Sequence, residues 1–235
     1  MNDYGKDNPT PQTNDGAEKS IRSFLAEASA ISSRTFESIQ ALAGTTFCKG
    51  VQINALRKFA IENHCWFPDA SVLGVYADRG SENEVYTSKY SDIVFKLNDF
   101  RYADDNLNSF FDRIQIHNFY FPDCQYDLIG FGLNSSNNFC AILSQPFIRA
   151  EREATNEEIT EALTSNGFLP QLDGEYFSNG EYDIFDALPN NVLYGTDGHL
   201  YFIDTIIFHS KEQNFNVYKN LSPRYNNDNS INKNK

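Results

Sequence analysis

Residues 186–193 read Asp186-Ala-Leu-Pro-Asn-Asn191-Val-Leu193, and residues 198–204 read Gly198-His-Leu-Tyr-Phe-Ile-Asp204. The intervening Gly195-Thr-Asp-Gly198 has the composition of a tight hairpin turn. Two strands joined by such a turn run antiparallel, so the residues at their outer ends lie close together. The sequence therefore predicts that Asn191 and Asp204 are neighbours in space.

Oxygen donors from adjacent strand ends suit Mg²⁺, a hard cation that keeps waters and substrate phosphates as additional ligands. We therefore predict that Asn191 and Asp204 bind metal. The alternative is an ordinary surface hairpin with incidental acidic residues, because Asp-Gly turns are common.

A lysine earlier in the chain is a candidate for binding phosphate. In Ile93-Val-Phe-Lys96-Leu97 three apolar residues precede the lysine, which is the pattern of a phosphate-binding strand. Any phosphate must be held by local positive charge, because the net charge of the chain is −13. The alternative is a solvated lysine on an edge strand.

Two further segments would complete a nucleotide site. Gly80 opens Gly80-Ser-Glu-Asn-Glu-Val-Tyr86, whose backbone amides could cover phosphate oxygens, although Glu84 adds negative charge there. An ordinary turn at a strand entry is the alternative. The backbone of Gln145-Pro-Phe147-Ile148 could hold an adenine, or the segment could simply be a buried strand that ends at a proline.

The bulk composition bounds the class of protein. With 235 residues, of which 40% are hydrophobic and 14% aromatic, the chain can build a core for one domain or two small lobes. The negative charge argues against nucleic acid and anionic membranes as partners. No apolar segment has membrane-spanning or signal-peptide character, so we expect a cytoplasmic protein. Free thiols or small core residues are expected at the four isolated cysteines, Cys48, Cys65, Cys124 and Cys140.

The spacing of apolar residues along the chain predicts its helices and strands. Helices are predicted over 18–43 (with Ser32-Ser33 as a candidate break), 53–63 and 105–119, and hairpins over 84–97 and 127–145. Thr155 and Glu158 have the spacing of a capping box, and Gly167 would close that helix. The predicted organisation is a disordered tail (1–17), a helical N-terminal extension (18–70), a functional domain (71–210) and a polar, disordered C-terminal tail (211–235).

Together, these segments resemble the protein-kinase superfamily. The resemblance rests on Glu82-Asn-Glu-Val-Tyr86, Val94-Phe-Lys96, Gln145-Pro-Phe-Ile148, Asp186 to Asn191, and Ile203-Asp204. The spacing Asp186-x-x-x-x-Asn191 equals that of the kinase catalytic loop. The closest likeness is to the compact serine/threonine/tyrosine kinase-like domains of polyvalent proteins from bacterial mobile elements. Aminoglycoside and small-molecule phosphotransferases are also similar.

The resemblance implies an α+β, minimal two-lobed kinase-like fold, with a β-rich N-lobe containing one helix and a truncated C-lobe. It implies an ATP- and Mg²⁺-dependent phosphotransferase acting on a protein or small-molecule hydroxyl. Lys96 would bind the α- and β-phosphates, and Asp186 would be the catalytic base. Asn191 and Asp204 would bind the metal, and Gly80, Gln145, Phe147 and Ile148 would contact the nucleotide.

The sequence departs from the family pattern in four places. Ile184-Phe185 replaces the His-Arg that precedes the base, and Thr205 replaces the glycine after the metal aspartate. No glutamate lies between Lys96 and Glu151 to pair with the lysine, and Asp112 would be a weak substitute. Few residues remain after Asp204 for an activation segment. The alternative function is therefore a pseudokinase-like module that binds nucleotide or a partner protein without catalysis.

Overall fold

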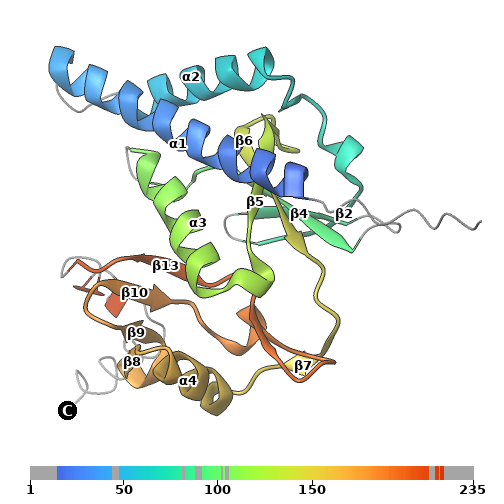
Figure 1. Ribbon diagram of the computed structural model, residues 1–235, viewed down its shortest axis with the longest axis vertical. Coiled ribbons are helices and arrows are strands. Elements are labelled where there is room, and N and C mark those ends of the chain that lie inside the picture. Colours follow the sequence, from blue (N-terminus) through green and yellow to red (C-terminus); the bar gives the residue numbers. More distant parts are fainter. Residues whose placement is uncertain are drawn as a thin grey trace, which may run out of the picture.

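The computed structural model describes residues 15–43, 48–80, 83–87, 92–101, 103, 106–211, 215–216 and 218–219. Most of both predicted tails and residues 81–82 and 88–91 lie outside the described residues. Two helices cover one side of a large sheet, and two smaller sheets and a helix form the other half of the molecule (Figure 1). The predicted α+β class is confirmed.

The N-terminal helices are α1 (Asp15–Ala43) and α2 (Cys48–Glu62). The predicted break at Ser32-Ser33 is wrong, because α1 is continuous through both residues. Ser32 is buried, and its hydroxyl donates to Asn108 Oδ1 at 2.7 Å. The buried amide of Gln52 donates to Ser32 Oγ at 2.9 Å and accepts from the Leu107 amide at 3.0 Å. These bonds satisfy polar groups that would otherwise be costly to bury, and they join α1, α2 and the chain leading to the next helix.

The N-lobe is a six-stranded sheet in the order β1-β5-β6-β4-β3-β2. Its strands are β1 (Trp66–Phe67), β2 (Val75–Arg79), β3 (Asn83–Thr87), β4 (Ile93–Asn98), β5 (Asp127–Leu133) and β6 (Phe139–Pro146). The predicted pairing of β3 with β4 and of β5 with β6 is confirmed. Helix α3 (Asn108–Tyr120) matches the helix predicted over 105–119, and its buried Phe110, Phe111 and Ile114 share a core with α1, α2 and the sheet.

The C-lobe contains two smaller sheets, β13-β10-β9-β8 and β12-β11-β7. Their strands are β7 (Ala150–Glu153), β8 (Leu169–Gln171), β9 (Tyr176–Ser178), β10 (Tyr182–Phe185), β11 (Val192–Gly195), β12 (Leu200–Phe202) and β13 (Ile206–His209). Helix α4 (Asn156–Ser165) begins with the predicted capping box, in which Thr155 and Glu158 exchange hydrogen bonds. Phe215 and Tyr218, which fall in the predicted tail, pack against Tyr176.

Neither a membrane-crossing helix nor a disulfide is found in the described part of the chain. None of its helices combines the length and apolarity that a bilayer span requires. All four cysteines are free, and three of them are buried.

Two glycines allow β1 to run parallel to β5. A Cβ at Gly130 would overlap the Cys65 carbonyl oxygen, and one at Gly132 would overlap the Phe67 carbonyl oxygen. We therefore expect Gly132→Ala to lower the free energy of unfolding by about 1–3 kcal/mol, because the strands must separate.

Gly50→Ala is the matched control, because a Cβ at this exposed helical position meets nothing within 4 Å. It should raise the free energy of unfolding by about 0.5–1 kcal/mol. Urea denaturation of both variants measures the two changes. Equal effects of the two substitutions would contradict the close approach of β1 to β5.

Candidate functional site

Strand pairing in the C-lobe brings the predicted acidic residues together. Phe185 at the end of β10 pairs with Ile206 at the start of β13, so Asp186 and Asp204 lie at the same end of this strand pair. In the neighbouring hairpin the Ile203 amide donates to the Asn191 carbonyl at 3.0 Å. Asn191 and Asp204 therefore come from adjacent strand ends, as the hairpin turn predicts.

The loop from Asp186 to Asn191 is closed by its own side chains. Asn191 is 7% exposed, and its Nδ2 donates to the Asp186 carbonyl at 2.8 Å. Its Oδ1 accepts from Asn190 Nδ2 at 2.9 Å and keeps a second lone pair. Asp186 has φ +61°, a left-handed conformation that aspartate tolerates better than most residues and that is often found at functional sites.

Lys96 connects the two lobes. Its ammonium donates to the Ile203 carbonyl at 2.7 Å and pairs with Asp204 Oδ1 at 3.4 Å. The alternative of a solvated edge-strand lysine is wrong, because β4 lies between β3 and β6 and the Lys96 side chain is only 7% exposed. This lysine therefore fixes the position of Asp204 from the centre of the N-lobe sheet.

Three further side chains bind the backbone that leads to Asp204. The Tyr126 hydroxyl donates to the Ile203 carbonyl at 2.7 Å. The Phe202 carbonyl accepts a hydrogen bond from the Cys124 thiol at 3.3 Å and lies 3.0 Å from His117 Nε2. Burial raises the pKa of Tyr126 well above its usual value and that of Cys124 to about 12, so both groups stay protonated and donate. A carbonyl only accepts, so His117 carries its proton on Nε2.

The sequence pattern does not predict that Tyr126, Cys124 and His117 belong to the site. Their contacts join segments that lie far apart in the chain, and no local pattern predicts such contacts. One signal was present on α3, where Arg113 and His117 occupy positions i and i+4 beside the apolar Phe110 and Ile114. Polar residues inside an otherwise apolar helical face mark a functional or structural site.

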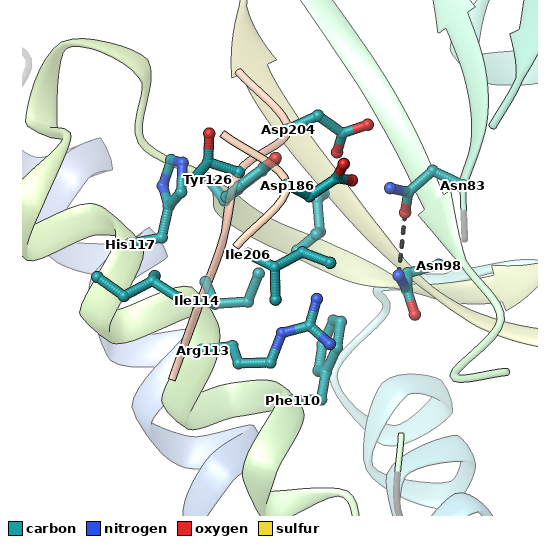
Figure 2. A pocket seen from close by; sticks show the side chains of 13 residues that line it. Asn83, Asn98, Phe110, Arg113, Ile114, His117, Tyr126, Asp186, Asp204 and Ile206 are labelled. Atoms are coloured by element: carbon teal, nitrogen blue, oxygen red, sulfur yellow. Dashed lines mark hydrogen bonds between the residues drawn. The ribbon is translucent and has the colours of Figure 1, made fainter. Parts of the chain in front are cut away.

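Asp186 and Asp204 line one cavity of about 60 Å³ between the lobes (Figure 2). The opposite wall carries Asn83 and Asn98, which are joined by a hydrogen bond of 3.0 Å from Asn98 Nδ2 to Asn83 Oδ1. Helix α3 contributes Arg113 to the same cavity. The described residues thus place two carboxylates, two amides and a guanidinium around one small space.

The predicted nucleotide contacts lie elsewhere. Gly80 donates its amide to Asn83 at 2.9 Å, and the buried Gln145 side chain donates to the Cys124 carbonyl at 2.6 Å. The Phe147 amide donates to the Asp92 carbonyl at 2.9 Å. Neither these three residues nor Ile148 is among the described residues that line the cavity. Their roles stay predictions.

Two expectations about acidic residues change. Glu84 does not put its charge in the cavity, because it is 2% exposed, accepts from the Ser135 amide at 3.0 Å and pairs with Arg79 at 3.5 Å. Asp112 is exposed and interacts electrostatically with His209 on β13, so it does not substitute for the missing glutamate beside Lys96.

The buried His117 makes the stability of the protein depend on pH. Burial lowers its pKa from 6.5 to about 4. Between these values the unfolded chain binds a proton that the folded protein excludes, so stability is lost as the pH falls. We expect the free energy of unfolding to decrease by about 3 kcal/mol from pH 7 to pH 4 on account of this group.

His117→Gln isolates the contribution, because glutamine can donate to Phe202 without titrating. The unfolding free energies of wild type and this variant are measured by denaturation at several pH values. Their difference should change with pH over the range in which the histidine of the unfolded chain takes up a proton. His199→Gln, at a side chain that is 74% exposed, is the control. Parallel stability curves for wild type and His117→Gln would contradict the burial of a neutral imidazole.

Comparison with known proteins assigns the family. The model of a family described as the serine/threonine/tyrosine kinase found in polyvalent proteins matches residues 49–211, which confirms the resemblance seen in the sequence. The match begins in α2, and the predicted domain boundary at residue 71 stays a prediction. Neither a curated protein nor a solved structure matches the chain. With more than two thirds of its residues covered by the match, the chain belongs to the family of serine/threonine/tyrosine kinases found in polyvalent proteins.

Proposed function

We propose that the protein is an ATP- and Mg²⁺-dependent phosphotransferase that phosphorylates a hydroxyl group of a protein or small molecule. One observation carries this proposal: the carboxylates of Asp186 and Asp204 line a single cavity, with Lys96 bonded to the Asp204 segment. Phosphoryl transfer needs this combination of a proton acceptor, metal ligands and positive charge.

The oxygen donors fit a magnesium ion. Asp204 has a side chain that is 44% exposed. Asn191, whose Oδ1 keeps a lone pair, comes from the adjacent strand end, although it is not among the described residues that line the cavity. Among the described residues no group of three or more His, Cys, Asp or Glu side chains could hold a metal. Mg²⁺ is commonly bound by only one or two carboxylates together with substrate phosphates, so the smaller set is sufficient. When bound, the ion would neutralise charge on the phosphate oxygens.

The proposed chemistry assigns a role to each residue. Asp186 accepts the proton of the substrate hydroxyl, whose oxygen forms a bond to the terminal phosphorus of ATP. The bond between that phosphorus and the bridging oxygen breaks, and ADP leaves. Lys96 holds Asp204 in place and adds positive charge beside the α- and β-phosphates. Gly80 and the segment from Gln145 through Phe147 to Ile148 are proposed to contact the rest of the nucleotide.

A second candidate function is a pseudokinase-like module without catalysis. It is favoured by the state of Lys96, whose buried ammonium already has Ile203, Asp204 and Tyr126 as partners. A lysine satisfied in this way can stabilise the fold without contacting phosphate. Nucleotide binding without phosphate transfer would support this candidate.

Asp186→Asn tests the proposed reaction. The amide cannot accept the proton, so transfer of labelled phosphate from ATP should fall by about 10²-fold or more. Because Asp186 is a base and not a proposed metal ligand, binding of Mg·ATP measured by equilibrium dialysis should change little. The control is Asp197→Asn, at an exposed position in the β11–β12 turn.

Proteins, including the chain itself, small molecules that carry a hydroxyl group, and water should each be tried as phosphate acceptors. Equal transfer rates for wild type and Asp186→Asn would exclude Asp186 as the base. Binding of Mg·ATP by wild type with no transfer to any acceptor would favour the pseudokinase function.

A further inference from the structure

The sheet β13-β10-β9-β8, from which the chain enters Asp186, has two different faces, because successive residues of a strand point to opposite sides. One face is buried in the C-lobe core through three apolar residues, Phe177, Ile184 and Ile207. The other face carries three aromatic residues whose rings lie together, Tyr176, Phe185 and Phe208. An aromatic surface of this kind is stabilised when further apolar groups remove it from water.

Phe215 and Tyr218, which follow β13, supply such a cover. The centroid of the Phe215 ring lies 5.2 Å from that of Tyr176. The Tyr218 ring lies 5.5 Å from Tyr176 and 4.8 Å from Phe185, which are favourable separations for aromatic pairs. Both residues come after residue 211, where the family match ends. This contact therefore lies outside the part of the chain that the family assignment covers.

A buried carboxylate fixes the ring on which both residues pack. Tyr176 is 1% exposed, and its hydroxyl donates to Asp183 Oδ2 at 2.6 Å. Burial and this hydrogen bond raise the pKa of Tyr176, so the hydroxyl stays protonated and donates. Asp183 is 2% exposed, and its Oδ1 has no hydrogen-bond partner in the described part of the chain. Loss of the tyrosine bond would leave both oxygens unsatisfied, which is costly, so the Tyr176 ring is held in place.

The contact of Tyr218 reaches the residue directly before the proposed base. Phe185 is the last residue of β10, and Asp186 follows it with φ +61°. A residue keeps such a conformation only where the surrounding structure holds it there. On the C-terminal side Asn191 does so through its hydrogen bond to the Asp186 carbonyl. On the N-terminal side Phe185 is in contact with the rings of Phe208 and Tyr218, at 5.2 and 4.8 Å.

We propose that Tyr218 is a positioning residue, whose ring packs on Phe185 and holds the loop from Asp186 to Asn191 in the conformation that presents the base to the cavity. Its effect on phosphate transfer rests on the proposed function, whereas its effect on the loop does not. Neither Phe215 nor Tyr218 is among the described residues that line the cavity. Loss of the Tyr218 contact therefore lowers the rate of transfer without weakening nucleotide binding.

Hydrogen exchange tests the effect on the loop. The Asn191 amide donates to the Leu188 carbonyl at 2.8 Å within the loop, so its exchange rate, measured by NMR, reports opening of the loop. In Tyr218→Ala this exchange should be about threefold to tenfold faster, the factor that corresponds to the loss of one aromatic pair. Tyr218→Phe keeps the ring and should stay within about twofold of wild type. Tyr218→Leu replaces the alanine variant if circular dichroism shows that the latter does not fold.

The amide of Gly167, which donates to the Thr164 carbonyl at the end of α4, is the internal control and should exchange at the same rate in all variants. Unchanged exchange at Asn191 in Tyr218→Ala, even with a lower melting temperature, would overturn the proposal, because a contact that only stabilises the fold has this effect. Equal acceleration at Asn191 and Gly167 would overturn it as well.

Kinetics of phosphate transfer test the effect on the base. In Tyr218→Ala kcat should fall about threefold to tenfold, while KM for Mg·ATP changes less than about twofold. Tyr218→Phe should restore the wild-type kcat. Phe119→Ala, which removes a ring that is 77% exposed on α3, is the control and should leave both constants unchanged.

A wild-type kcat in Tyr218→Ala, or an increase in KM as large as the decrease in kcat, would overturn the role of Tyr218 and leave the proposed function intact. No transfer by wild type would overturn the proposed function and with it the catalytic effect of Tyr218. The exchange rates would in that case still decide whether Tyr218 holds the loop.

Discussion

The buried ammonium of Lys96 is the point on which the two halves of the site depend. It projects from β4 in the middle of the N-lobe sheet and donates to the Ile203 carbonyl at 2.7 Å, beside Asp204 at 3.4 Å. A buried ammonium that lacks hydrogen-bond and charge partners is costly, because burial removes the water that would otherwise solvate it. The energetic penalty of an unpaired lysine therefore forces the Asp204 segment of the C-lobe to stay against the sheet.

The surrounding residues support the same segment from other directions. His117 from α3, Tyr126 before β5 and Cys124 all contact the carbonyls of Phe202 or Ile203. The loop 186–191 forms the other side of the site. Asp186 has a positive φ there, and the Asn191 side chain donates a hydrogen bond to the Asp186 carbonyl. The site can lack the glutamate expected on α3, because Asp204 itself is the carboxylate partner of Lys96. Helix α3 is then available to contribute Arg113 to the cavity.

Local sequence patterns predicted the elements whose determinants are close together in the chain. The capping box at Thr155 and Glu158, the hairpin turn after Gly195 and the apolar strand that carries Lys96 are of this kind. The role of Ser32 could not be predicted, because a serine pair in a helix suggests a break unless its buried partners Gln52 and Asn108 are known.

The residues of the candidate site also divide into those that local spacing predicts and those that depend on long-range packing. Asp186, Asn191 and Asp204 were found from spacing because they belong to one short supersecondary unit. The pairing of β13 with β10, which sets Asp186 beside Asp204, joins strands that are separated by a complete hairpin. Contacts of His117 and Tyr126 with residues about eighty positions away depend on the packing of the lobes. Such contacts have no local signature, so only the folded structure gives them.

In the proposed function, Asp204 binds the Mg²⁺ that accompanies ATP at the cavity. The most direct test of this role is the melting temperature of wild type and Asp204→Ala at a saturating concentration of Mg·ATP, with Glu161→Gln on the exposed side of α4 as the control. Ligand at about 100 times its dissociation constant adds about 2.7 kcal/mol of stability, which corresponds to about 5–10 °C for a chain of this size. We expect that increase in wild type and in Glu161→Gln, and none in Asp204→Ala. No increase in wild type, or an equal increase in Asp204→Ala, would contradict a magnesium–nucleotide site at Asp204.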